Sequence, residues 1–176
     1  MEKSGMELHA NVSYSGSTVC GSSTSCGANE TRLSKLIVDG KAPDVLIILL
    51  GVNDICSGTP AADFKTTYKA MLASIKALCP DTDIFITNIH YETASDGTGN
   101  APASYKHEGL REEYNVVIGE IAKEESLPLI DLAAVITKDT DAFGAKTYVG
   151  DNIHYNAAGM ELVANTALAV LKEFYK

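Results

Sequence analysis

Asp151 and His154, three positions apart, are the residues in this sequence whose types and spacing point most directly to chemistry. They precede a predicted helix that Asn156 can cap, and within a turn this spacing lets the carboxylate reach Nδ1 of the imidazole. A carboxylate bound there fixes the ring tautomer and stabilises the imidazolium, as a general base for a hydroxyl nucleophile requires. The same spacing also arises by chance, and the alternative is a helix-entry aspartate beside a surface histidine.

Two other segments carry groups that can stabilise an anion. The sequence G-V-N-D at residues 51–54 follows the most apolar stretch of the chain, and the side-chain amide of Asn53 can serve as an oxyanion donor. In the S-G-S sequence at residues 15–17, the backbone N–H of Gly16 can point at an anion. The alternatives are an ordinary turn for the first segment and a flexible Ser/Gly loop for the second.

The pattern of apolar residues predicts the elements that must position these groups. Predicted strands cover residues 8–13, 44–50, 83–88 and 127–132, and predicted helices cover residues 30–38, 60–79, 104–125 and 156–174. In the last helix we expect an inward face of Met160, Val163, Ala164, Ala167, Val170, Leu171 and Phe174. The alternation of strands and helices predicts an α/β fold, a three-layer α/β/α sandwich around a parallel sheet, with residues 44–50 buried on both faces.

The carboxyl edge of such a sheet is where chemistry is expected. The two anion-stabilising segments each follow a predicted strand, and the turn with His154 precedes the last predicted helix. His90 also follows a strand at this edge. It either lines the cleft or is a partly buried histidine with one backbone partner.

The composition sets outer limits on function. The chain has 176 residues, which fits one domain over residues 1–176, and 14 basic against 23 acidic residues give a net charge of −9. No cluster of Lys and Arg is present, so a nucleic-acid partner is not expected. The longest apolar run is far too short for a membrane span, and no signal-peptide pattern follows Met1, so the compartment stays unknown. No metal or nucleotide motif occurs, so we expect no cofactor and no metal.

The four cysteines match no zinc-binding spacing. Cys20 and Cys26 can close a small disulfide loop in an oxidising compartment, or all four cysteines are free thiols. The chain is large enough not to need a covalent staple, which favours free thiols.

Taken together and in this order, the three segments resemble the SGNH hydrolases, also called GDSL-type esterases and lipases. Residues 51–54 match the family's G-x-N-D block, Asp151 and His154 match its D-x-x-H block, and residues 11–18 resemble its glycine block. The resemblance covers nearly the whole chain. It implies a flavodoxin-like parallel sheet and an ester hydrolase that transfers an acyl group to water from a small ester, a lipid or an acylated carbohydrate.

The resemblance also implies a role for each matched residue. His154 is the general base and Asp151 orients it. Asn53 and the Gly16 amide belong to the oxyanion hole. Asp54 is structural and bonds within its own loop, or it lines the cleft with His90.

The family's G-D-S block, which carries the nucleophile after its first strand, does not occur in this sequence. The resemblance therefore implies a chain that is N-terminally truncated relative to the family and lacks the first strand. In the family's strand order this leaves roughly 9–10 Å between residues 8–13 and residues 44–50. A longer natural protein is the favoured explanation. Otherwise the two strands pair directly, or another chain donates a strand, as in a homo-oligomer that covers the gap.

The missing block leaves the nucleophile open. Ser13, Ser15 and Ser17 lie in the glycine block and are candidate substitutes for the missing serine. The alternative function is a non-catalytic descendant of the fold that binds an acylated or sugar ligand in the old cleft.

Overall fold

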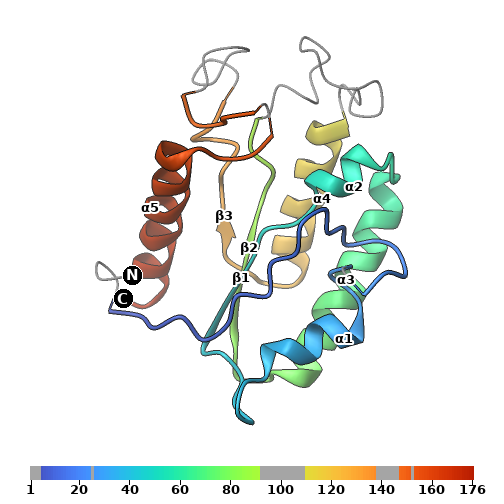
Figure 1. The fold of residues 1–176 in the computed structure, drawn as a ribbon, viewed down its shortest axis with the longest axis vertical. Helices are drawn as coiled ribbons and strands as arrows, with labels where there is room; N and C mark the ends of the chain where they lie inside the picture. Colours follow the sequence, from blue (N-terminus) through green and yellow to red (C-terminus); the bar gives the residue numbers. More distant parts are fainter. Residues whose placement is uncertain (1–4, 25, 92–109, 138–146, 152) are drawn as a thin grey trace.

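The protein is described by a computed structural model that covers residues 5–24, 26–91, 110–137, 147–151 and 153–176. Three strands, β1 (Val45–Ile48), β2 (Asp83–Thr87) and β3 (Leu129–Ile130), form a parallel sheet in the order β1-β2-β3. The helices are α1 (Glu30–Leu33), which continues into the 3₁₀ helix η1 (Ser34–Leu36), α2 (Val52–Cys56), α3 (Ala61–Leu78), α4 (Leu110–Glu124) and α5 (Ala157–Phe174). The sheet lies between α5 on one side and α1, α3 and α4 on the other (Figure 1). The predicted three-layer α/β fold is confirmed.

Most predicted elements are present, with shifted boundaries. The helix predicted at 30–38 ends earlier, and the strand predicted at 127–132 shrinks to two residues. Residues 104–109 of the predicted fourth helix lie outside the described residues. Helix α2, predicted only as a turn, is an additional element. Within the described ranges, no helix is long and apolar enough to cross a membrane.

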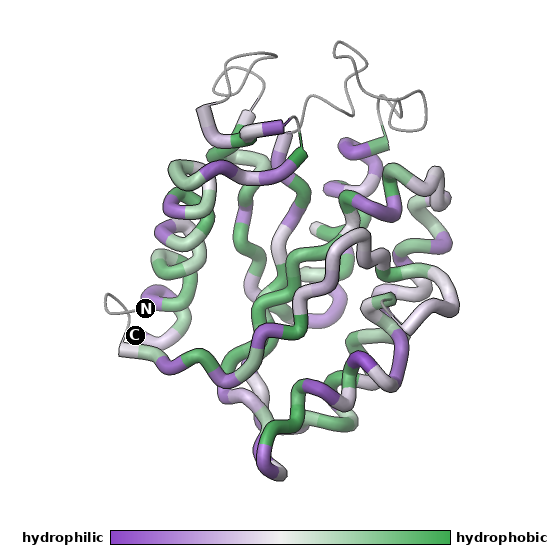
Figure 2. The backbone as a smooth tube through the Cα atoms, viewed as in Figure 1, coloured by the Kyte–Doolittle hydropathy of each residue, from purple (hydrophilic) through white to green (hydrophobic). Residues whose placement is uncertain are grey.

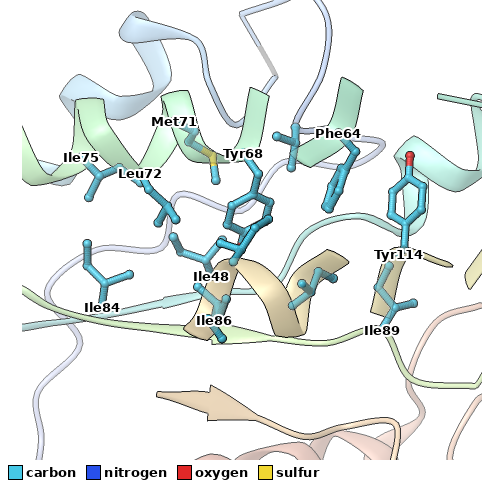
Figure 3. Packing of buried hydrophobic residues seen from close by; sticks show 14 of the residues in the cluster. Ile48, Phe64, Tyr68, Met71, Leu72, Ile75, Ile84, Ile86, Ile89 and Tyr114 are labelled. Atoms are coloured by element: carbon cyan, nitrogen blue, oxygen red, sulfur yellow. The ribbon is translucent and has the colours of Figure 1, made fainter. Parts of the chain in front are cut away.

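The main core lies between the sheet and helices α3 and α4. Apolar residues at helical spacing on α3 are buried, namely Phe64, Tyr68, Met71, Leu72 and Ile75. Figure 3 shows the side chains of α3 pointing toward Ile48 of β1 and Ile86 of β2. Figure 2 shows the apolar character of the strands in the middle of the molecule. This core holds α3 against β1 and β2, the strands that precede α2 and His90 in the chain.

Helix α5 covers only part of the opposite face. Its Ala167 and Leu171 pack against Phe85 of β2 and Ile130 of β3. Ile47 of β1 pairs in register with Phe85 and so faces the same side, yet its side chain is 42% exposed. The prediction that residues 44–50 are buried on both faces is therefore wrong, because the core under α5 centres on β2 and β3 and includes β1 only at the partly buried Val45.

Part of the predicted inward face of α5 is exposed. Met160 and Ala164, predicted to face inward, are exposed, and Phe174 is exposed although its ring contacts Phe85 with centroids 5.1 Å apart. Ala167 and Leu171 are buried as expected. Val163 and Val170 are partly buried against the same cluster, so the inward face of the helix is narrower than predicted.

The predicted strand at residues 8–13 is wrong, because no ladder forms there. This segment is held by other contacts: Nε2 of His9 bonds to the carbonyl of Leu36 at 3.0 Å, and Nε of Arg32 donates to the carbonyl of Val12 at 3.2 Å. Among the described residues no strand pairs with the outer edge of β1. Direct pairing of residues 8–13 with β1, one of the three expected arrangements, is thereby excluded.

Candidate active site

The candidate residues gather at the carboxyl end of the sheet. Helix α2 follows β1 directly, and the turn that precedes α5 lies at the same end of the molecule (Figure 1). Asn53 and Asp54 belong to α2, and Asp151 and His154 belong to the turn. The sheet therefore presents both groups on one edge, as a parallel α/β fold does with its functional residues.

Asp151 and His154 form a hydrogen-bonded pair. Oδ2 of Asp151 lies 2.7 Å from Nδ1 of His154, and Oδ1 accepts from the backbone N–H groups of His154 at 2.7 Å and of Ile153 at 3.2 Å. Partial burial acts to raise the pKa of Asp151, but the bonds from His154 and Ile153 outweigh it and leave the pKa below its ordinary value. Because an ionised carboxylate only accepts, the proton sits on Nδ1 and a neutral ring has Nε2 unprotonated.

The turn around this pair is closed by backbone hydrogen bonds. The N–H of Gly150 donates to the carbonyl of His154 at 2.8 Å, and the N–H of Asn156 donates to the carbonyl of Tyr148 at 2.9 Å. Oδ1 of Asn156 accepts from the N–H of Gly159 at 2.9 Å and caps α5, as predicted. The side chains of Asp151 and His154 are nevertheless 61% and 78% exposed, so little packing holds them.

Asn53 is positioned by a sharp turn at the end of β1. Gly51 has φ +125°, and a Cβ added there would lie 2.8 Å from Cδ1 of Ile89, so only glycine fits. The following residues form α2, and Nδ2 of Asn53 donates to the carbonyl of Ser17 at 3.0 Å. The bond ties α2 to the glycine block and uses one of the two amide hydrogens of Asn53.

Asp54 ties α2 to the same loop a second time. Its side chain is fully buried, and it accepts from the N–H of Val19 at 2.8 Å and from the N–H of Cys20 at 2.9 Å. Burial raises the pKa of Asp54, and these two bonds act in the opposite direction. Asp54 was expected to be structural and to bond within its own loop, whereas α2 directs its carboxylate toward the segment that follows the glycine block.

Within the described part of the chain, no serine hydroxyl is hydrogen-bonded to His154. Gly16 is exposed at φ +69°, Ser13 and Ser15 are exposed, and Ser17 is buried. Among the described residues, none of the hydroxyls of Ser13, Ser15 and Ser17 makes a hydrogen bond to His154. These serines therefore stay predictions as nucleophiles.

His90 is buried, with 3% exposure. Its Nδ1 lies 2.7 Å from Oη of Tyr155, its Nε2 lies 3.3 Å from the carbonyl oxygen of Ile153, and its ring contacts that of Tyr155 at 4.4 Å. Of the two alternatives for His90, the structure favours the buried one, with a side-chain partner in addition to the backbone partner. The sequence does not reveal Tyr155 as a site residue, because a contact across 65 residues leaves no local signal.

The structure has no disulfide between the four cysteines: Cys20 and Cys26 follow the glycine block, Cys56 ends α2, and Cys79 is in the main core. Sγ of Cys26 donates to the carbonyl of Cys20 at 3.2 Å, and burial raises the pKa of the Cys20 thiol. Of the two alternatives for this pair, the structure has the free thiols and no disulfide.

Known proteins resemble this chain in sequence and in fold. "Uncharacterized esterase YxiM" of Bacillus subtilis (strain 168) is 26% identical over 151 residues, a match that spans 82% of this chain but only 38% of that protein. The crystal structure of the acetyl xylan esterase AlAXEase superposes with a TM-score of 0.58 at 19% identity, over 72% of this chain and 66% of that one. The crystal structure of a carbohydrate esterase family 3 protein from Talaromyces cellulolyticus superposes with a TM-score of 0.60 at 19% identity. The match covers 84% of this chain and 65% of that one.

At such identities the solved structures show a shared fold. The sequence evidence goes further, because the model of one family matches residues 2–162, which is most of the chain. On that match, this chain belongs to the GDSL-like lipase/acylhydrolase family.

Proposed function

We propose that this chain carries the base and the oxyanion-binding groups of an ester hydrolase. The observation that carries the proposal is the 2.7 Å bond between Asp151 and Nδ1 of His154, at the same end of the sheet as Asn53. Membership of the acylhydrolase family supports it. The bond leaves Nε2 as the ring nitrogen that can accept a proton.

The reaction proceeds by two acyl transfers. A serine hydroxyl attacks the ester carbonyl carbon while Nε2 of His154 takes its proton, and Asp151 stabilises the imidazolium. The negative oxygen of the tetrahedral intermediate accepts hydrogen bonds from the Asn53 amide and the Gly16 N–H, each worth about 3 kcal/mol in such sites. The carbon–oxygen bond to the alcohol then breaks as His154 returns the proton to the departing oxygen. Water attacks the acyl-serine by the same route and releases the acid.

The substrate we propose is a small ester or an acylated carbohydrate. Two of the similar structures are named as an acetyl xylan esterase and a carbohydrate esterase, which supports this class. The loop of residues 18–29 beside the site is rich in Ser, Thr and Gly, and small polar residues suit an open polar site better than a long acyl chain. Residues 93–103, the other loop expected to set specificity, lie outside the described residues.

A second candidate function is binding of an acylated ligand without hydrolysis. It is favoured by one observation: among the described residues, no hydroxyl of Ser13, Ser15 or Ser17 is hydrogen-bonded to His154. In this case Asn53 and Gly16 would bind the carbonyl oxygen of the ligand, and His154 would have no proton to transfer.

Labelling with a serine-reactive fluorophosphonate, read by intact mass, separates the two functions. Hydrolysis predicts a single adduct whose rate of formation falls by about 10²–10⁴-fold in His154→Ala. Peptide mapping then shows whether Ser13, Ser15 or Ser17 carries it. Ser22→Ala, an exposed serine outside the glycine block, is the control and should label as the unmodified chain does. A folded chain with no adduct contradicts hydrolysis by this chain, and calorimetric binding of an acetylated oligosaccharide would then support the second function.

A further inference from the structure

His90 is a buried histidine for which the proposed reaction has no direct use. Its Nε2 must donate to the carbonyl of Ile153, because a carbonyl oxygen only accepts. In the neutral ring, Nδ1 then carries no proton and accepts from the hydroxyl of Tyr155. Both ring nitrogens are therefore bonded to the turn that holds His154.

The two partners of His90 stand on either side of His154 in the chain. Ile153 precedes it and Tyr155 follows it. One side chain from the end of β2 thus binds the residue before His154 through a backbone carbonyl and the residue after it through a hydroxyl. The side chain of His154 is 78% exposed, so its direction depends on its backbone and on its bond to Asp151 rather than on packing.

The backbone around His90 is itself held on both sides. Asn115 of α4 bonds to both backbone groups of Ile89: its Oδ1 accepts from the N–H at 2.8 Å and its Nδ2 donates to the carbonyl at 2.9 Å. On the other side, the N–H of Tyr91 donates to the carbonyl of Ile136 at 2.9 Å. His90 therefore connects the exposed turn to the rigid end of the central strand.

We propose that His90 is a positioning residue, which fixes residues 153–155 so that the imidazole of His154 keeps a single orientation beside Asp151. The importance of that orientation for catalysis rests on the proposed function of His154 as the base. The anchoring itself does not rest on it, so the two can be tested separately.

Three variants test the anchoring. His90→Phe keeps an aromatic ring in the buried position and removes both hydrogen bonds, and Tyr155→Phe removes the hydroxyl bond alone. His9→Phe is the matched control. It also removes a hydrogen bond between a histidine and a backbone carbonyl, that of Leu36, in a part of the chain that does not contact the turn of residues 153–155 in any bond described above. Tyr155→Phe also keeps the proposal testable if His90→Phe does not fold.

The measurements are amide hydrogen exchange at residues 153–155 and the ring ¹⁵N shifts of His154, neither of which requires turnover. We expect His90→Phe to speed exchange of the His154 amide at least tenfold and to shift its ring signals, with a smaller change in Tyr155→Phe and none in His9→Phe. Exchange and ring signals like those of the unmodified chain in both His90→Phe and Tyr155→Phe would overturn the proposal. So would an equal rise in exchange in α3, which would show a general loss of stability.

The fluorophosphonate rate distinguishes this proposal from the proposed function. Anchoring of the turn is supported when the ring signals change as expected, whether or not an adduct forms. If an adduct forms, its rate should fall about tenfold or more in His90→Phe, because small misplacements of a reacting group are costly. An unchanged rate in that case would contradict the positioning role.

Discussion

Two buried tyrosines of the main core differ in whether the hydroxyl has a partner. Oη of Tyr114 donates to the carbonyl of Thr59 at 2.7 Å, whereas Oη of Tyr68 is fully buried and has no hydrogen-bond partner among the described residues. A buried polar group without a partner costs about 1–3 kcal/mol. Tyr68→Phe should therefore raise the free energy of unfolding by about 1 kcal/mol, and Tyr114→Phe should lower it by about as much.

Urea unfolding of the two variants measures the difference. The two substitutions remove the same atom from the same type of residue, so each serves as the control for the other. A Tyr68→Phe chain that loses as much stability as Tyr114→Phe would show that the Tyr68 hydroxyl is satisfied in solution, for example by a buried water molecule.

Asp54 makes stability depend on pH in the direction opposite to most carboxylates. Burial raises its pKa above the value of about 3.9 in an unfolded chain, so the folded state retains the proton longer as pH rises. Its contribution to stability is therefore complete below about pH 4 and is lost as pH rises through the folded pKa. Asp54→Asn stays neutral at every pH, so the wild-type chain should lose stability relative to this variant as pH rises.

Urea midpoints of both chains between pH 3.5 and 7 test the sign. In the difference between the two chains, the pH dependence of all other groups cancels, because both chains contain these groups. A wild-type chain that gains stability relative to Asp54→Asn on raising the pH would show that the bonds from Val19 and Cys20 outweigh burial.

The sequence reveals site residues only where their contacts are local. Asp151 and His154 are three positions apart, and a turn before a helix is enough to predict their bond. Asn53 meets Ser17 across 36 positions, and His90 meets Tyr155 across 65 positions, and these pairs depend on how the strands are stacked. A single sequence carries no signal for them.

Helix α5 begins directly after the turn that holds His154. At Gly159, in the first turn of this helix, there is no room for a side chain. A Cβ added to Gly159 would lie 2.1 Å from the carbonyl oxygen of Tyr148, in backbone that closes the turn. Gly159→Ala should therefore force the helix away from the turn and lower the free energy of unfolding by about 3 kcal/mol or more.

Gly119 of α4 provides the matched comparison for this helix glycine. A Cβ added there meets no atom within 4 Å, so Gly119→Ala should raise the free energy of unfolding by about 0.5–1 kcal/mol through helix propensity. Thermal unfolding of both variants measures the contrast. Equal effects of the two substitutions would contradict the close approach of Gly159 to Tyr148.

A helix or strand can be predicted from sequence when the pattern of apolar residues within the segment is enough to determine its structure. Helix α3 has an amphipathic pattern bounded by prolines, and it forms over nearly the predicted residues. The segment 8–13 has the composition of a strand, but a strand also needs a partner, and no segment that the structure describes pairs with it. Helix α2 reads as a turn because its five residues include Asn and Asp, and the bonds that hold these two side chains go to Ser17 and Val19, more than 30 positions away.

In the whole molecule, helices cover the two faces of the sheet unequally. Helices α3 and α4 pack the larger core against one face, whereas α5 covers β2 and β3 on the other. Ile47 and Leu49 remain 42% and 43% exposed on the β1 side of that second face. No described strand pairs with this edge of β1, and apolar side chains beside such an edge favour pairing with another chain.

Ile47 and Ile48 are adjacent on β1 and point to opposite faces, so they test this inequality directly. Ile48 is buried in the main core, and Ile48→Ala should lower the free energy of unfolding by about 2–5 kcal/mol. Ile47→Ala should cost less than about 1 kcal/mol, since much of that side chain stays in water in the folded state. Both variants lose the same strand propensity, so the difference reports burial alone.

Urea unfolding at two protein concentrations, with sedimentation velocity on the same samples, gives the measurement. An Ile47→Ala variant that loses as much stability as Ile48→Ala would mean that the β1 side of this face is covered in solution. A loss that grows with protein concentration, together with a dimer that the variant weakens, would identify the cover as a second copy of the chain. A monomer with a small, concentration-independent loss would instead show that β1 folds with this side open, because α3 and α4 hold it from the other face.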